Sequence, residues 1–345
     1  MAEQSLAVKY RPTTFDDVCE QGSVKAILQN QLDNNTVKNA YLFCGGAGTG
    51  KTTCARIFAN EINKGKGEPA ELDAASNNSV DDVRNIIQQS KTQSLDSEYR
   101  IFIIDECHAL SNSAWQAFLK VLEEPPKKSI FIFATTDPQK IPKTILSRVQ
   151  RYDFKRLSQK AVVDRLWYIL EQEDKGNKFE SDLIWTKDAV EYLAKLSEGG
   201  MRDAITLLDK CLSYSQELTV ENVVSALGTV DYSRMFDLVN AVHGNNLSAV
   251  IDVVESVHSD GKDLKQFIRS LMSFLLDVVK YDITGSMQYL QLPYTYQDTL
   301  KGQTKEWFAT SQRLLDIVVK LNSDIKWDTQ PKVLIEATLI SVVGG

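Results

Sequence analysis

Short apolar runs alternate with amphipathic segments through the first half of this sequence. The apolar runs are AYLFCG (40–45), AELDA (70–74), RIFIIDE (100–106) and SIFIFATT (129–136). The first three are followed by segments with helical spacing, GKTTCARIFANEI (50–62), SVDDVRNIIQQ (79–89) and NSAWQAFLKVLEE (112–124). Repeated strand-then-helix units predict an α/β fold, in which helices cover a parallel sheet whose strands are buried on both faces.

The pattern changes after about residue 157, and helical periodicity dominates from there to the end. Helices are predicted in the segments 159–173, 186–198, 201–215 and 219–228, and from residue 231 onward. The exception is LQLPYTYQDTLKGQ (290–303), which we expect to be a loop. We therefore predict an α/β domain at 1–157, a small helical domain at 158–228 and a second helical domain at 229–345.

The segment GGAGTGKT (45–52) matches G-x-x-x-x-G-K-[ST] between an apolar run and a helical segment. Glycines let the backbone curl so that its N–H groups face phosphate oxygens. In this pattern Lys51 would reach the β- and γ-phosphates and Thr52 would ligate Mg²⁺. The residues predicted to bind ATP here are Gly45, Gly46, Ala47, Gly48, Thr49, Gly50, Lys51, Thr52 and Thr53.

Acidic and hydroxyl residues end the last two of the four apolar runs. Asp105 ends a predicted strand, and an acid at this position holds Mg²⁺ in nucleotide hydrolases that have a loop like GGAGTGKT. Glu106 beside it is placed to deprotonate water. The run FATT offers Thr135 or Thr136 to hydrogen-bond the attacking water or the γ-phosphate. A strand-end hydroxyl that caps a turn is the alternative interpretation. These residues together predict an ATPase.

Composition narrows the class of protein only slightly. The 345 residues are 43% hydrophobic and 25% charged, with a net charge of −7, so any contact with nucleic acid must be local or shared between subunits. None of the five cysteines has C-x-x-C spacing, and we expect them to be small core residues. No apolar run is long enough to span a bilayer and the first residues are unlike a signal peptide. We expect a cytoplasmic protein without a membrane partner.

Seven segments occur in the order found in clamp-loader AAA+ ATPases. They are VKYRPTTFDDVCEQ, YLFCGGAGTGKTT, ELDAASNN, FIIDECHALS, LKVLEEPP, FATTDPQKIPKTILSRVQRYDF and GGMRDAI. The chain resembles most the bacterial DNA polymerase III gamma/tau subunits, densely from about residue 7 to 230. The resemblance implies a P-loop AAA+ domain, a helical lid and a helical collar that supports oligomerisation.

The resemblance also implies roles for single residues. Arg11 and Pro12 would pack beside adenine, and Thr136 would be sensor 1. Arg202 in GGMRDA would be sensor 2 and touch the γ-phosphate of its own subunit. Arg148 would be an arginine finger for ATP bound by the neighbouring subunit; a surface arginine paired with a carboxylate is the alternative.

Three departures from the family pattern bear on what to expect. The four-cysteine zinc module of the bacterial subunits is replaced by NKGKGEP (63–69), so no zinc should bind. Val149 follows the finger arginine where the family has cysteine. The sequence ends soon after the third domain, so a tau-like polymerase-binding tail is expected to be absent, as would suit a compact loader of viral origin.

The segment SNNSVDDVRN begins a predicted helix, with Ser79 and Asp82 at the spacing of an S-x-x-D cap. In clamp loaders the equivalent helix start follows the DNA backbone, which makes Asn77, Asn78, Ser79 and Arg84 candidates for DNA contact. Helix capping alone would also explain this pattern. Trp115 and Phe118 could face a sliding clamp, although burial is the expected state of such aromatic residues.

The function implied is the ATPase motor of a clamp loader. Its expected partners are other clamp-loader subunits, a sliding clamp and primer-template DNA. One rival is a DExH-type helicase, since DECH (105–108) has that form, but such helicases need a second RecA-like lobe and His108 fits a surface or packing role. The other rival is a scaffold subunit that does not hydrolyse ATP.

Overall fold

A computed structural model describes residues 4–92, 94, 96–176, 183–228, 232–303 and 305–344. The chain divides into two compact units. The first contains residues 1–165 and 197–206, and the second contains residues 166–196 and 207–345. Each unit is described below by itself.

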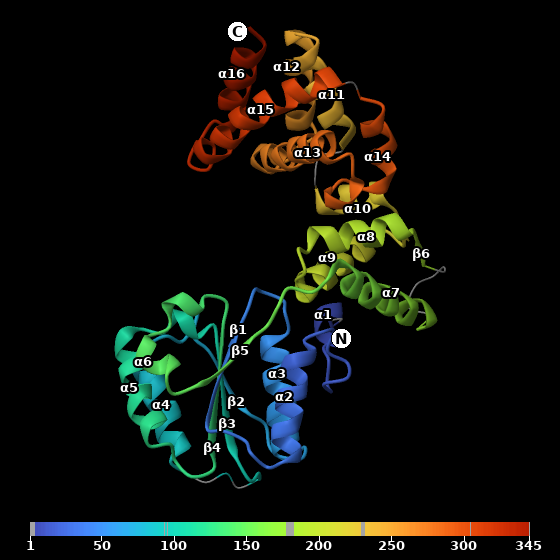
Figure 1. Ribbon diagram of the computed structural model, residues 1–345. Helices are drawn as coiled ribbons and strands as arrows, with labels where there is room; N and C mark the ends of the chain where they lie inside the picture. Colours follow the sequence, from blue (N-terminus) through green and yellow to red (C-terminus); the bar gives the residue numbers. More distant parts are fainter. Residues whose placement is uncertain are drawn as a thin grey trace. The chain divides into compact units, whose positions relative to one another are not determined.

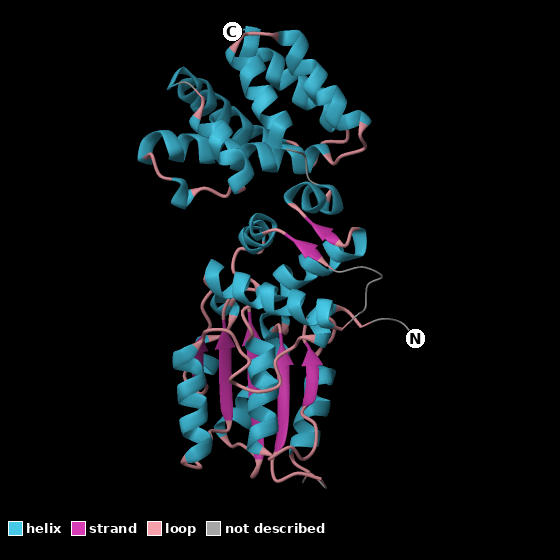
Figure 2. Ribbon diagram, turned by 90° about the vertical axis from the view of Figure 1, so that its right-hand side faces the viewer, coloured by secondary structure: helices cyan, strands magenta, loops and turns pink. Residues whose placement is uncertain are grey.

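The first unit is built on a five-stranded parallel sheet in the order β2-β3-β4-β1-β5. Figure 2 shows the arrows of this sheet pointing the same way. Because all strands are parallel, their carboxyl ends and the loops that follow them lie along one edge of the sheet. The strands are β1 (Ala40–Cys44), β2 (Ala70–Asp73), β3 (Arg100–Asp105), β4 (Ser129–Thr135) and β5 (Gln150–Asp153).

Helices cover both faces of this sheet, with α2 and α3 on one side and α4, α5 and α6 on the other (Figure 1). Alternate side chains of each strand enter the two cores. Tyr41 and Phe43 of β1 pack with Phe58 of α3, whereas Leu42 packs on the opposite side with Phe118 of α5. The helices of this unit are α1 (Leu6–Lys9), α2 (Gly22–Asp33), α3 (Lys51–Ile62), α4 (Val80–Ser90), α5 (Asn112–Glu123) and α6 (Lys143–Leu146), with the 3₁₀ turns η1 (Cys107–Ala109) and η2 (Pro138–Lys140).

The described residues of the second unit form helices, with two short strands, β6 (Ile184–Trp185) and β7 (Glu217–Leu218), that pair in parallel. From α11 onward the helices enclose one apolar core that includes Phe236, Phe274 and Trp307. The helices that lie wholly or partly in this unit are α7 (Gln159–Lys175), α8 (Lys187–Leu196), α9 (Met201–Tyr214), α10 (Val220–Leu227), α11 (Tyr232–His243), α12 (Leu247–Ser259), α13 (Leu264–Thr284), η3 (Met287–Tyr289), α14 (Tyr294–Lys301), α15 (Lys305–Asp324) and α16 (Pro331–Gly344).

The predicted α/β fold with following helices is confirmed, and one element is corrected. The expected loop at 290–303 is wrong for most of its length, because residues Tyr294–Lys301 form α14. Tyrosine and threonine are weak helix formers, but Gln297 and Leu300 lie three residues apart and are both buried, so packing outweighs local propensity.

The three predicted domains remain a prediction, because two compact units do not test where a lid would end and a collar would begin. The predicted boundary after residue 228 adjoins residues 229–231, which lie outside the described part of the chain.

Candidate nucleotide-binding site

A cavity of about 300 Å³ opens at the carboxyl edge of the first unit's sheet. The predicted residues that line it are Arg11, Pro12, Ala47, Gly48, Thr49, Gly50, Lys51, Thr52, Thr53, Asp105, Glu106 and Arg202. Residues from four separate sequence segments therefore meet at one site, as the order of parallel strands predicts.

The loop between β1 and α3 depends on glycine conformations. Gly48 and Gly50 have φ angles of 68° and 99°, in the region that favours glycine. A Cβ atom on Gly48 would lie 2.9 Å from the Cα of Gly200, so the close approach of these two segments also requires glycine. No side chain caps the N-terminus of α3, which leaves its first-turn N–H groups available to an anion.

Lys51 lies within this loop. It is only 6% exposed, and its Nζ donates to the carbonyl oxygens of Gly45 and Gly46 at 2.9 and 2.8 Å. Burial lowers the pKa of Lys51, while the nearby carboxylates of Glu106 and Asp105 oppose that shift. A buried cation held by neutral carbonyls is a favourable partner for an anionic phosphate.

Thr52 and Asp105 bring two oxygen donors together. The Thr52 hydroxyl donates to Asp105 Oδ2 at 2.6 Å, joining the first turn of α3 to the end of β3. Hydroxyl and carboxylate oxygens are the ligands that Mg²⁺ prefers. The glycine loop, the uncapped helix and this oxygen pair fit a magnesium-bound triphosphate.

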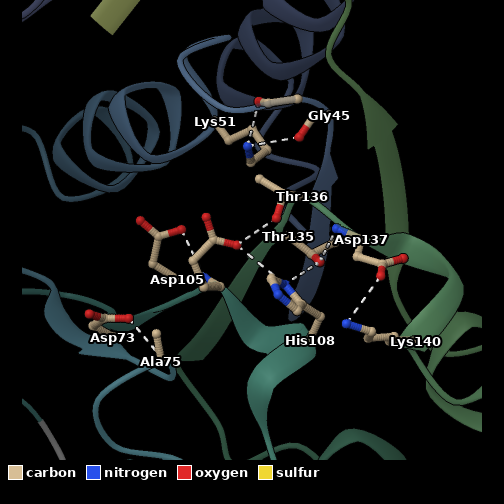
Figure 3. A network of polar contacts seen from close by, with 12 residues as sticks. Gly45, Lys51, Asp73, Ala75, Asp105, His108, Thr135, Thr136, Asp137 and Lys140 are labelled. Atoms are coloured by element: carbon tan, nitrogen blue, oxygen red, sulfur yellow. Dashed lines mark hydrogen bonds and ion pairs between the residues drawn. The ribbon is translucent and has the colours of Figure 1, made fainter. Parts of the chain in front are cut away.

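The Glu106 carboxylate is contacted by two side chains from other elements, Thr136 and His108, which Figure 3 labels. The Thr136 hydroxyl donates to Glu106 Oε2 at 2.9 Å, and His108 Nδ1 lies 3.2 Å from the same oxygen. Thr135 has a different contact, since its hydroxyl accepts from the Asp137 N–H at 3.0 Å and lies 3.2 Å from His108 Nδ1. Thr136 is therefore the threonine that contacts Glu106, and Thr135 caps the turn.

Sequence reasoning missed several residues of this site. His108 was expected at the surface or in packing, yet its ring contacts both Glu106 and Thr135. Tyr10 and Arg165 also line the cavity, and the Arg165 guanidinium donates to the Tyr10 carbonyl at 2.9 Å. No motif includes Arg165, which lies 155 positions from Tyr10, so no local pattern could reveal this contact.

Arg148 lies away from the cavity. It follows α6 and precedes β5, at the amino edge of the sheet, and lines a second cavity with Lys38 and Gln150. At about 3.3 Å per residue, a strand of the length of β1 separates the two edges by about 15 Å, which exceeds the reach of an arginine. Its guanidinium donates to Glu123 Oε1 at 2.8 Å and to the Thr144 carbonyl at 2.7 Å.

The residues predicted to contact DNA surround the start of α4. Ser79 and Asp82 form a complete capping box, and Arg84 pairs with Asp81 at 2.9 Å on an exposed surface. The Asn77 amide donates to the Asp73 carbonyl, and the Asn78 carbonyl accepts from the Ser111 N–H. These contacts explain the local fold, and the DNA role of these residues stays a prediction.

Other side chains proposed from the sequence lie in the core. Trp115 and Phe118 are 2% and 0% exposed, so neither presents a face to a partner. Four of the cysteines are buried and Cys19 is half-buried. Over the described ranges, no helix combines the length and apolar character that crossing a bilayer requires.

Two family models match the sequence. The model described as DNA polymerase III, delta subunit, matches residues 71–158, and the model described as DNA polymerase III subunits gamma and tau domain III matches residues 218–344.

Curated relatives agree with these family models. The DNA polymerase III subunit tau of Bacillus subtilis is 33% identical over 365 residues, covering 99% of this chain and 63% of the relative. The gamma/tau subunit of Mycobacterium tuberculosis is 32% identical over 362 residues, covering 96% and 61%. The chain thus spans about three fifths of the length of these curated relatives.

Among solved structures, the RuvB Holliday junction branch migration motor of Thermotoga maritima aligns with a TM-score of 0.51 at 18% identity, covering 74% of this chain and 86% of that one. At that identity the likeness concerns the fold alone. The sheet, the P-loop and the helices that follow, together with the similarity to gamma/tau subunits, define a AAA+ P-loop protein. Within that class the chain is a homologue of the DNA polymerase III gamma/tau subunits and belongs to the clamp-loader family.

Proposed function

We propose that the chain is the ATPase motor subunit of a sliding-clamp loader. ATP binding would drive clamp opening and primer-template binding, and hydrolysis would release the clamp on DNA. The observation that carries this proposal is that Lys51, the Thr52–Asp105 pair and Glu106 line one cavity. Thr136 does not line it but donates a hydrogen bond to Glu106. It is supported by homology to gamma/tau subunits along nearly the whole chain.

Each of these residues has a distinct task in ATP hydrolysis. The N–H groups at the start of α3 and the Lys51 ammonium bind the phosphates. Thr52 and Asp105 would hold Mg²⁺, which neutralises charge on the β- and γ-phosphates when bound. Glu106 accepts a proton from the attacking water, and Thr136 fixes the carboxylate that does so. Arg202 contacts the γ-phosphate from the segment that begins α9.

Arg148 completes the site of a neighbouring subunit. Its distance from its own cavity favours action in trans, because a side chain at the amino edge of the sheet can reach a nucleotide only if a neighbouring subunit presents one there. An arginine finger contributes about 10³ to 10⁵ in rate, or about 4 to 7 kcal/mol. In that role Arg148 exchanges Glu123 for a neighbour's phosphate, and hydrolysis depends on assembly.

The partners in this proposal are other clamp-loader subunits, a sliding clamp and primer-template DNA, with contact to DNA through Asn77, Asn78, Ser79 and Arg84. In this proposal residues 158–228 are a helical lid, and the collar at 229–345 carries the oligomer. No observation favours a helicase, since the described residues beyond the first unit contain only a two-stranded sheet. The intact Lys51, Asp105 and Glu106 argue against a scaffold that does not hydrolyse ATP.

Two substitutions test this function in the assembled complex. Lys51→Ala should abolish tight ATP binding, because it removes the buried cation of the loop. Arg148→Ala should leave ATP binding within about twofold while reducing DNA- and clamp-stimulated hydrolysis by about 10³ or more. Nucleotide titration and steady-state ATPase assays with primed DNA and clamp measure both effects.

Arg151→Ala is the matched control, because Arg151 is also a partly exposed arginine paired with a carboxylate, Asp153, at 2.7 Å. It should hydrolyse ATP at the wild-type rate. Normal hydrolysis by Arg148→Ala in the complete assembly would show that Arg148 has no role in trans.

A further inference from the structure

Gln21 occupies an unusual backbone position just before α2. Glu20 and Gln21 have φ angles of 54° and 53°, a region that residues other than glycine rarely adopt. Two consecutive residues of this kind persist only where the surrounding contacts hold them. We therefore expect contacts with surrounding residues to hold Gln21 in place, and its side chain makes such contacts.

The buried Gln21 amide joins two segments that are distant in sequence. Its Nε2 donates to the Lys155 carbonyl at 2.7 Å and to the Thr49 carbonyl at 3.3 Å, and its Oε1 accepts from the Lys155 N–H at 3.1 Å. Both amide donors and the amide oxygen are used. These partners require an amide, because a carboxylate would place an oxygen against two carbonyl oxygens.

Lys155 belongs to a connector, residues 154–158, that leads from β5 into α7. The connector contacts the segment that carries Arg202, since the Leu157 N–H donates to the Gly199 carbonyl at 3.1 Å. A Cβ atom on Gly199 would lie 2.7 Å from the Leu157 carbonyl oxygen, so this contact is also sterically close. Glu20 anchors the far end of the connector by accepting hydrogen bonds from Ser158.

The segment that carries Arg202 returns to the P-loop. The Met201 N–H donates to the Gly48 carbonyl at 2.9 Å, and Gly48 approaches Gly200 closely. The P-loop, the connector and residues 199–201 thus form a closed ring of contacts, in which the Gln21 side chain links the P-loop to the connector. All of these residues belong to the first compact unit.

We propose that Gln21 is a positioning residue that fixes the P-loop relative to Arg202, and so sets the preference of the site for a triphosphate over a diphosphate. The proposal rests on the proposed nucleotide-binding function. Gln21 does not line the cavity, so it acts through the backbone of Thr49 and Lys155. Because Arg202 is the γ-phosphate contact in that function, displacing it weakens ATP binding more than ADP binding.

The test compares ATP and ADP affinities of the full chain by calorimetry or fluorescent-nucleotide competition. Gln21→Glu should reduce ATP affinity by about tenfold or more and ADP affinity by less than about threefold. Gln21→Met has a similar volume and makes none of the three hydrogen bonds. It should show the same selective loss, and it decides the question if Gln21→Glu does not fold.

Gln31→Glu is the matched control. Gln31 is also a buried glutamine; its amide donates to Gln150 and to the Tyr152 hydroxyl and accepts from the Tyr41 hydroxyl, away from the cavity. It should lower thermal stability to a similar extent and keep the wild-type ratio of ATP to ADP affinity.

An unchanged ratio in both Gln21 variants would overturn the proposal, as would an equal change of that ratio in Gln31→Glu. If the wild-type chain itself binds no ATP, the proposed function has failed, and that result is distinct from either of these.

Discussion

At the scale of single residues, His108 explains how Glu106 is oriented. The ring nitrogen Nδ1 lies 3.2 Å from Glu106 Oε2, and a carboxylate oxygen can only accept, so Nδ1 must carry a proton to bond it. Thr136 donates to the same oxygen from the end of β4. Two donors from different elements therefore fix one carboxylate, and this would hold Glu106 in place for its proposed role as general base.

We expect His108→Ala to lower kcat for ATP hydrolysis by about tenfold, because a general base that loses one of two positioning contacts spends less time in its reactive orientation. Affinity for ATP should stay within about twofold, since His108 does not line the cavity. Single-turnover hydrolysis and nucleotide titration separate these two quantities. His258→Ala, at an exposed position of α12, should change neither. A loss of affinity equal to the loss of rate would contradict a positioning role.

The residues that sequence could identify are those whose chemistry depends on their neighbours in the chain. Lys51 and Thr52 are adjacent in one loop, and Asp105 and Glu106 are adjacent at the end of one strand. His108, Gln21 and Arg165 depend on contacts between separate elements. The residues next to them in the sequence form no recognisable motif, and their partners become neighbours only in the folded chain. Sequence alone could therefore not single them out.

At the scale of elements, α14 shows why a helix was missed. The loop before α14 is held from outside by Asp277 of α13, which accepts hydrogen bonds from the N–H groups of Gln291 and Leu292 at 2.7 and 2.8 Å. Asp188 of α8 accepts from the N–H groups of Tyr294 and Thr295 at the start of α14. Besides the packing of Gln297 and Leu300, carboxylates on two other helices thus hold the start of α14, and no pattern within 290–303 reveals them.

Asp277 should give the second unit a measurable pH dependence. It is 2% exposed, and burial raises its pKa to about 6 from an ordinary value of 3.8. Because folding raises this pKa, the stabilising contribution of the protonated form is fully present below the unfolded pKa and is lost as pH rises through about 6. In Asp277→Asn the side-chain oxygen can still accept from the N–H groups of Gln291 and Leu292, but the amide group does not titrate.

The quantity to follow is the difference in unfolding free energy, wild type minus Asp277→Asn. We expect this difference to fall by about 1.4 kcal/mol between about pH 5 and about pH 7.5. Urea denaturation of both proteins at several pH values measures this difference, in which the titration of all other groups largely cancels. A difference that stays constant with pH would show that Asp277 has the same pKa in the folded and unfolded chain.

At the scale of the whole molecule, the residues proposed for hydrolysis lie at two opposite edges of one sheet. Lys51, Asp105 and Glu106 lie at the carboxyl edge, and Arg148 lies at the amino edge. The alternation of strands and helices predicted this sheet from sequence, and the P-loop was predicted between one strand and the helix that follows it. Arg148 at the amino edge would meet a nucleotide only through a neighbouring subunit, and the sequence of one chain does not define that contact.

That separation leads to a prediction about mixtures of two inactive proteins. Lys51→Ala removes a subunit's own phosphate contact but keeps its Arg148, and Arg148→Ala has the opposite defect. Where copies of this chain are neighbours in the assembly, a Lys51→Ala subunit can supply Arg148 to the intact P-loop of an Arg148→Ala subunit. We expect mixed assemblies to recover DNA- and clamp-stimulated ATPase activity, because a trans arginine contributes about 10³ or more in rate. If subunits pair at random, up to about a quarter of the wild-type activity should return.

The double variant Lys51→Ala/Arg148→Ala is the control. Assemblies in which it is mixed with either single variant should stay inactive, because no site then combines an intact P-loop with an intact Arg148. If the two single variants together hydrolyse no more ATP than the sum of their separate rates, Arg148 does not act between copies of this chain.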